Sequence, residues 1–314
     1  PGVGMGSPTD ADWQRVGELT LGPTMANVAE GEFAGVELTF MGLNNQNLHN
    51  FLFRGFLAPW ERYTGAKINW IDLAQADYNA RLQQSIATGT VDFDVLEMGA
   101  PFEGDTAGRG LLDPMPDWVK AQIEADDLVA YLQPPVGTWD GQTYRITIDG
   151  DTHTMAYRKD YFGEGSITGL AEVPDTWQGI NEMSKQLASA GATDPLTGLP
   201  AYGFLDPLKY QWGGFGFYFL GDRAAAYAKH PDDPAWLFDP DTMKPRVNNP
   251  AWVQAIQDVM DLMAANAYPP DQVNADPNAT AFAQFLGGTG AALTWWGDVG
   301  SNARTSDTSV VGDV

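Results

Sequence analysis

Two tryptophans stand side by side near the end of the sequence, in ALTWWGDVG at residues 292–300. An indole face packs well against the C–H face of a sugar or polyol, and a carboxylate such as that of Asp298 accepts hydrogen bonds from hydroxyl groups. Successive side chains of a strand point to opposite faces, so only one of Trp295 and Trp296 packs simply into a core. We expect the other ring to act as a stacking platform for a ligand.

A second aromatic group lies in KYQWGGFGF, which carries Tyr210, Trp212 and Phe215. The glycines between these rings allow a ligand to approach the backbone closely. Aromatic faces beside carboxylates and amides suit polyhydroxylated molecules.

The stretch DGDTH at 149–153 places two carboxylates and one imidazole at every second position. In an extended segment Asp149, Asp151 and His153 project from the same face. Three interpretations stay open: an exposed turn capped by aspartate, hydrogen bonds to a ligand, or a metal site. A second acidic stretch, DPDTMKP from Asp239, lacks the glycine and glutamate of a calcium loop and predicts a solvated turn.

The composition excludes several classes of function. The 314 residues carry a formal net charge of -24, which opposes binding to nucleic acids and to anionic lipids. There is no cysteine, so disulfides, thiolate metal sites and thiol nucleophiles are absent. No apolar run of about 18 residues predicts a membrane span. The sequence starts at Pro1 without a charged-then-apolar stretch, so we expect that an export signal has been removed or was never present.

Short catalytic signatures are also missing. The sequence contains no phosphate-binding GxxxxGK[ST], no GxGxxG after a strand, no HExxH and no GxSxG, and it has only three histidines. We therefore expect a binding protein without a catalytic residue, metal or other cofactor. A glycosidase stays open as the alternative, because paired carboxylates beside tryptophans also occur in such enzymes and follow no short motif.

The first half of the chain alternates strands and helices, which predicts an α/β lobe with a parallel sheet. Val36, Leu38 and Phe40 alternate with polar residues, and the helix that follows the second strand has Asp77 as its expected N-cap. Strands are expected at 35–42, 67–73 and 91–98, and helices at 47–65 and from Asp77 to Gly89, with Tyr78, Leu82 and Ile86 as its buried face. Ligands of such sheets bind at the carboxyl ends of the strands, here near 42–46 and 98–100.

The second half is rich in helices. One helix should start after Asp175 or Thr176 and end at Gly191, and another should start at Pro250 with Asn249 as its cap. The periodicity of the latter predicts that its core face consists of Trp252, Ile256, Val259, Met260 and Met263. Together these patterns predict an irregular arm over 1–34, an α/β lobe over 35–148 and a helix-rich lobe over 149–314.

The order of these motifs resembles the extracellular solute-binding proteins of ABC importers, the family that includes sugar-binding and maltose-binding proteins. The resemblance runs from about Val36 to Trp296 and rests on motifs that are individually weak but specific in their order. They are GLNNQN, YNARLQQSIATGTVDFDVLEMGAPF, GRGLLDPMPDWV, YRITIDGDTHTMAYRKDYF, VPDTWQGINEMSKQL and ATAFAQFLGGTGAALTWWGD.

The resemblance implies a two-lobed periplasmic-binding-protein fold, in which two α/β lobes with mostly parallel sheets are joined by crossing strands and close around a solute. It implies a monomer that captures a neutral sugar, oligosaccharide or polyol between the lobes, outside the cell or in the periplasm, and delivers it to an ABC permease in the inner membrane. A metal or a polyamine is the alternative cargo.

The same resemblance assigns ligand-binding positions. It implies that Asn44, Asn45 and Gln46 line one wall and that Met98 and Gly99 line another. It places Asp151 at an acidic position of the crossover, and it places Tyr210 and Trp212, then Trp295 or Trp296, at the two aromatic positions of the second lobe.

The sequence departs from the family pattern in three places. Arg and Lys are sparse near the inferred cleft, which argues against a phosphorylated or strongly acidic ligand. Met98 replaces the aromatic residue that maltose-type members often carry, which argues against a long oligosaccharide. Family members also continue past the Trp-Trp segment, so we expect the second lobe to lack a C-terminal segment.

Overall fold

The computed structural model describes residues 28–43, 49–123, 128–209, 215–228, 235–306 and 309–310. The chain divides into two compact units, Pro1–Gly150 and Asp151–Val314. Of the arm expected at 1–34, residues 28–34 form turns, and the N–H groups of Gly31 and Phe33 donate to carbonyls at the end of the first helix. The rest of that arm lies outside the described residues.

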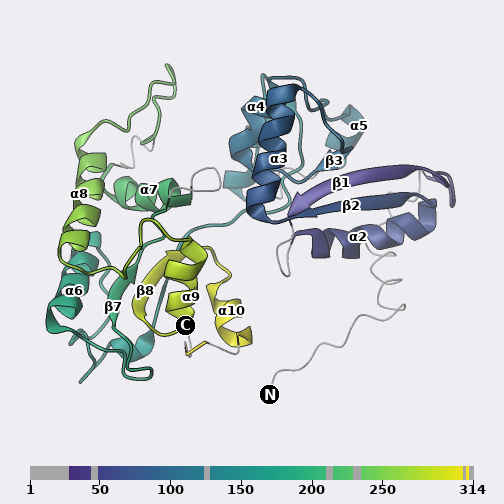
Figure 1. Cartoon of the computed structure of the whole chain (residues 1–314). Coiled ribbons are helices and arrows are strands. Elements are labelled where there is room, and N and C mark those ends of the chain that lie inside the picture. Colours follow the sequence, from purple (N-terminus) through teal and green to yellow (C-terminus); the bar gives the residue numbers. More distant parts are fainter. Residues whose placement is uncertain are drawn as a thin grey trace. The chain divides into compact units, whose positions relative to one another are not determined.

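The first unit contains a parallel sheet in the order β2-β1-β3 (Figure 1). Its strands are β1 (Glu37–Leu43), β2 (Lys67–Leu73) and β3 (Val95–Leu96), and its two long helices are α2 (His49–Thr64) and α3 (Gln75–Thr88). The expected alternation of strands and helices is therefore confirmed.

Adjacent residues of β1 explain why both faces of this sheet are covered. Phe40 and Met41 are both buried and point to opposite faces. Phe40 packs against Phe53 of α2, with ring centroids 5.3 Å apart. Met41 packs against Tyr78, Leu82 and Ile86, the predicted buried face of α3. Figure 1 shows α2 and α3 on either side of the strands.

Two predicted boundaries in this unit are wrong. Helix α3 begins at Gln75 rather than after Asp77, and Asp77 lies in its first turn, where a carboxylate interacts favourably with the helix dipole. The strand predicted over 91–98 shrinks to two residues, because the side chain of Asp94 accepts the N–H of Thr39 (2.7 Å) at the point where ladder pairing would begin. The predicted stop of α3 at Gly89 is confirmed by its left-handed conformation, φ 71°.

Short elements complete the first unit. They are η1 (Ala100–Phe102), α4 (Glu103–Ala107), α5 (Asp117–Lys120), η3 (Ala130–Leu132) and the antiparallel pair β4 (Thr138–Trp139) and β5 (Gln142–Thr143). Gly104 of α4 lets the Trp139 ring lie directly on the helix, since a Cβ at this position would stand 2.9 Å from that ring.

The second unit is built on a mixed sheet in the order β6-β8-β7. Strand β8 (Gly290–Trp295) is central and fully buried, pairing antiparallel with β6 (Thr154–Tyr157) and parallel with β7 (Tyr202–Leu205). Phe204 packs on the face covered by α6 (Trp177–Ala190), and Leu205 packs on the other face. The remaining elements are η4 (Lys159–Tyr161), α7 (Phe215–Ala228), α8 (Pro250–Ala264), η5 (Asn278–Phe282), α9 (Ala283–Leu286) and α10 (Val299–Thr305).

The caps of α6 and α8 follow the prediction. The hydroxyl of Thr176 accepts the N–H of Gly179 (3.2 Å), and Gly191 ends α6 in the left-handed region. The side chain of Asn249 accepts the N–H groups of Ala251 and Trp252, and Pro250 is the first residue of α8.

The predicted core face of α8 is largely wrong. Trp252 is buried as expected, but Ile256, Met260 and Met263 are exposed. The buried line instead follows Trp252, Ala255, Asp258 and Leu262, because small Ala255 allows close packing on α7 and the hydroxyl of Tyr227 in α7 donates to Asp258 (2.6 Å). A helix that is apolar around most of its circumference does not reveal which stripe its neighbour covers.

A buried ion pair fixes α7 to the sheet. Arg223 of α7 is fully buried and donates to Asp206 (2.7 Å), which directly follows β7, and to Asn181 of α6 (2.9 Å). Its guanidinium also lies over the ring of Trp177. These contacts hold α7 at the end of the sheet where β7 terminates.

Candidate ligand-binding site of the second unit

The site residues of the second unit gather where β7 and β8 end and β6 begins. Thr154 of β6 pairs with Trp295 of β8, so the residue before β6 and the residue after β8 lie at the same edge of the sheet. These residues are His153 and Trp296, 143 positions apart in sequence. Their rings meet with centroids 5.3 Å apart.

Four rings form a slipped stack at this edge. His153 lies on Phe219 of α7 with centroids 4.5 Å apart and planes 5° apart. Phe219 is stacked in turn on Trp295 (5.7 Å, 19°), and Trp295 is stacked on Phe282 of η5 (4.9 Å, 20°). The stack thus joins residues of β8, α7 and η5 to the segment before β6.

The two tryptophans differ in how deeply they are buried and in how they contact this stack. Trp295 is stacked with two phenyl rings and is 3% exposed, so it is a core residue. Trp296 is only partly buried and stands nearly perpendicular to three rings of the stack, at 80° to 83°. Of this pair, Trp296 alone keeps ring surface accessible to a ligand.

Asp298 presents a buried acceptor two residues after Trp296. Its Oδ2 accepts the side-chain N–H of Asn302 (3.0 Å). Its Oδ1 is buried and has no hydrogen-bond partner among the residues that the structure describes. A buried unpaired carboxylate oxygen is costly, and a ligand hydroxyl would satisfy it.

The electrostatic environment of Asp298 disfavours its charge. Burial raises the pKa of its carboxyl above the ordinary value, and the nearby negative charge of Asp151 raises that pKa further. Hydrogen bonds from the backbone N–H of Asp298 itself and from the Asn302 side chain oppose this shift. A donor supplied by a ligand would therefore stabilise the ionised carboxylate.

His153 has a partner that sequence reasoning missed. Its Nδ1 is 2.7 Å from Oδ2 of Asp222, a residue of α7 that lies one helical turn after Phe219. Phe219 and Phe282 were missed as well, because Phe219 lies more than 60 residues from His153 and Trp295, and Phe282 belongs to a different element from Trp295. No local motif signals such contacts.

The other predicted site residues fall into three groups. Asn44, Asn45, Gln46, Tyr210 and Trp212 lie outside the described residues, and Phe215 is the first residue of α7, where its side chain is not described. Asp149 and Gly99 are exposed in the first unit, where the Asp149 carboxylate accepts the N–H of Gly150 as in the capped-turn interpretation. Met98 is half-buried against the first unit's core and accepts a hydrogen bond from Thr106. Asp151 is exposed in the second unit.

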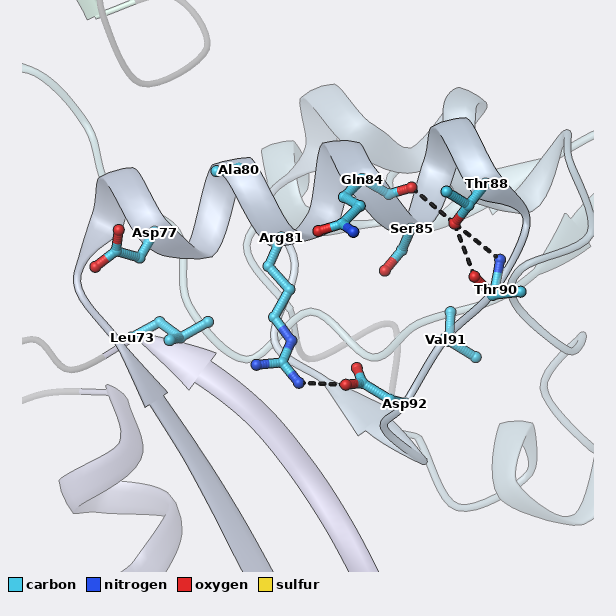
Figure 2. Close-up of a pocket in the computed structure, with 10 residues that line it drawn as sticks. All are labelled: Leu73, Asp77, Ala80, Arg81, Gln84, Ser85, Thr88, Thr90, Val91 and Asp92. Carbon is cyan, nitrogen blue, oxygen red and sulfur yellow. Dashed lines mark hydrogen bonds and ion pairs between the residues drawn. The ribbon is translucent and has the colours of Figure 1, made fainter.

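A separate hollow of about 630 Å³ runs along α3 in the first unit. Figure 2 shows that Arg81 and Asp92 pair with each other across its floor and that Thr88 and Thr90 share a hydrogen bond at one end. Its walls carry no aromatic ring, and its one basic group, Arg81, forms an ion pair with Asp92. It therefore lacks the aromatic rings that are found where β8 ends in the second unit.

Within the described ranges, no three histidine, aspartate or glutamate side chains come close enough to hold a metal ion. The Asp239 stretch forms a turn, in which the carboxylate accepts from the backbone and hydroxyl of Thr242 and pairs with Arg246. Also within those ranges, no helix has the length and apolar character needed to cross a bilayer.

Comparison with known proteins identifies the family that this fold and site suggest. The family model described as bacterial extracellular solute-binding protein matches residues 56–308. The chain belongs to this family, and its fold is the α/β fold of periplasmic binding proteins.

Individual relatives bind sugars or sugar alcohols. The mannitol-binding protein of Pseudomonas aeruginosa is 24% identical over 196 residues, which cover 62% of this chain and 41% of the relative. A solute-binding protein of Agrobacterium vitis, solved with D-mannitol, has a TM-score of 0.65 at 24% identity and covers 89% of this chain. One from Agrobacterium radiobacter, solved with ribitol, has a TM-score of 0.68 at 21% identity and the same coverage.

The maltose-bound MalE3 of T. maritima has a TM-score of 0.69 at 18% identity, over 89% of this chain. The chain spans less than two thirds of the length of its relatives, covering 62%, 65% and 66% of these three structures.

Proposed function

We propose that this protein binds a neutral sugar or sugar alcohol and that the edge formed by β6, β7 and β8 supplies one wall of the binding site. The observation that carries this proposal is the arrangement of Trp296 and Asp298. A partly exposed indole provides an apolar platform, and a buried carboxylate oxygen without a described partner provides an acceptor for a hydroxyl group.

The charges near this wall support a neutral or hydroxyl-rich ligand over an anionic one. Asp151 and Asp298 interact electrostatically, and Asp222 bonds His153. An anionic ligand group would be repelled by these three carboxylates. The relatives solved with mannitol, ribitol and maltose support the same class of solute.

The proposed role is binding and delivery without chemistry. Family members are extracellular solute-binding proteins, and we propose that this one is a monomer that works outside the cell or in the periplasm and passes its solute to an ABC permease. The same-fold alternatives, a metal or a polyamine as cargo, and the glycosidase alternative are outcomes of the test below.

Binding is tested by thermal unfolding of the full-length protein with D-mannitol, ribitol and maltose, followed by calorimetric titration. A solute at 100 times its Kd stabilises the fold by about 2.7 kcal/mol, which raises Tm by roughly 5 to 11 °C in a domain of this size. Gluconate, spermidine and zinc serve as anionic, cationic and metal comparisons.

A rise in Tm with a neutral solute that is recovered intact supports the proposal. A rise with spermidine or zinc alone contradicts the assigned cargo, and conversion of maltose to glucose contradicts a role without chemistry.

A further inference from the structure

The contact between His153 and Asp222 restrains the imidazole in two independent ways. Phe219, stacked 5° from parallel, sets the plane of the His153 ring. Asp222, 2.7 Å from Nδ1, sets the rotation of the ring within that plane. Both restraints come from one helix, because residues three apart on α7 lie on the same face.

The same contact decides which imidazole nitrogen carries the hydrogen. An ionised carboxylate only accepts hydrogen bonds, so Nδ1 of a neutral His153 is the donor and Nε2 keeps its lone pair. Nε2 has no hydrogen-bond partner in the part of the chain that the structure describes, and the His153 side chain keeps 19% of its surface exposed. An acceptor nitrogen is therefore left accessible beside Trp296.

Two side-chain atoms at this edge thus have the same hydrogen-bonding character. Nε2 of His153 and Oδ1 of Asp298 both accept hydrogen bonds, and neither has a partner in the described ranges. We propose that Asp222 is a positioning residue that holds His153 as a hydrogen-bond acceptor, so that this wall recognises a solute by the hydrogen atoms of its hydroxyl groups. This inference rests on the proposed function and specifies which atoms of the solute the site recognises.

The proposal makes a chemical distinction among close analogues. A hydroxyl and a fluorine are similar in size, and a fluorine has no hydrogen to donate. If the recognised hydroxyl donates to Nε2 of His153 or Oδ1 of Asp298, a solute in which that hydroxyl is replaced by fluorine must bind more weakly. A wall that merely packs against the solute tolerates that replacement.

The orienting role of Asp222 is tested first without any ligand. Nitrogen-15 spectra of the full-length protein at pH 8 distinguish the two neutral tautomers, and His153→Gln identifies the signal among the three histidines of the sequence. We expect the Nδ1–H tautomer in the unmodified protein and in Asp222→Asn, whose amide oxygen still accepts. Asp222→Ala should shift the signal toward the Nε2–H tautomer that prevails in water. An Nε2–H tautomer in the unmodified protein overturns the positioning role.

Affinity is tested next, by calorimetric titration with D-mannitol and ribitol. We expect Asp222→Ala to raise Kd at least tenfold and Asp222→Asn to stay within about threefold of the unmodified protein. Asp241→Asn removes the same charge from an exposed turn and should leave Kd unchanged. An equal loss in Asp222→Asn and Asp222→Ala shows that charge rather than orientation matters and overturns the proposal, as does unchanged affinity in Asp222→Ala.

A third measurement needs no variant and stays decisive if Asp222→Ala does not fold. Monofluorinated derivatives of mannitol are titrated into the unmodified protein, one for each hydroxyl position. At least one should bind ten or more times more weakly, and tight binding of all of them overturns the proposal. If no sugar or polyol binds at all, the proposed function fails together with hydroxyl recognition, while the tautomer still decides whether Asp222 orients His153.

Discussion

Truncation of the two adjacent tryptophans should have different consequences. Trp295 is 3% exposed and is stacked with both Phe219 and Phe282. Removing a buried aromatic side chain costs about 3–5 kcal/mol of unfolding free energy. Because about 1 kcal/mol lowers Tm by roughly 2–4 °C in a domain of this size, Trp295→Ala should lower Tm by about 6 to 20 °C.

Trp296→Ala should affect binding more than stability. Its ring is partly exposed and meets its neighbours at 80° to 83° instead of stacking between them. We expect a loss of about 1–2 kcal/mol in unfolding free energy, within the usual range for single substitutions. Loss of a stacking platform should weaken solute binding by about 1–3 kcal/mol, which is roughly 5- to 150-fold in Kd.

Urea unfolding and calorimetric titration with the best-binding polyol separate the two effects. Trp296→Phe keeps an aromatic face and should restore most of the affinity, which makes it the matched control. The reasoning is refuted if Trp296→Ala destabilises the fold more than Trp295→Ala does, or if it leaves Kd unchanged.

Three further substitutions test the fold and its electrostatics. Arg223→Met removes the cationic partner of the buried carboxylate of Asp206 and should cost about 3–5 kcal/mol in urea unfolding; a loss below about 1 kcal/mol would contradict the buried pair. Asn249→Ala removes the cap of α8 and should cost about 1 kcal/mol, whereas Gln257→Ala on the exposed side of that helix should change little. The raised pKa of Asp298 means that its stabilising contribution is complete below the ordinary aspartate pKa and is lost as the pH rises through the raised value. Asp298→Asn should therefore gain stability relative to the unmodified protein between pH 4 and pH 7, and a constant difference over that range would contradict the burial of this carboxyl.

Local chemistry explains which predictions from the sequence are confirmed. The caps at Thr176 and Asn249 and the stop at Gly191 depend on atoms within about three residues of the helix end. The parallel order of the first unit follows from strands separated by helices, and the buried face of α3 follows from its four-residue spacing. Each of these signals is complete within one segment.

The predictions that failed depended on a neighbour from another segment. The buried face of α8 is determined by its hydrogen bond with Tyr227 and its close packing on α7, and not by the apolar periodicity of α8 itself. Strand β3 is short because the Asp94 side chain takes a hydrogen bond from β1. A single-segment pattern carries no information about such partners.

The sequence alone determined that one tryptophan of the TWWGD stretch points away from the core, because side chains alternate along a strand. Only the tertiary structure decided that it is Trp296, since Phe219 and Phe282 reach Trp295 from α7 and η5. Likewise, the sequence marked His153 as a candidate, and the fold supplied Asp222 from 69 residues away. Residue types define which chemistry a chain can perform, whereas contacts between distant segments define which atoms remain free to perform it.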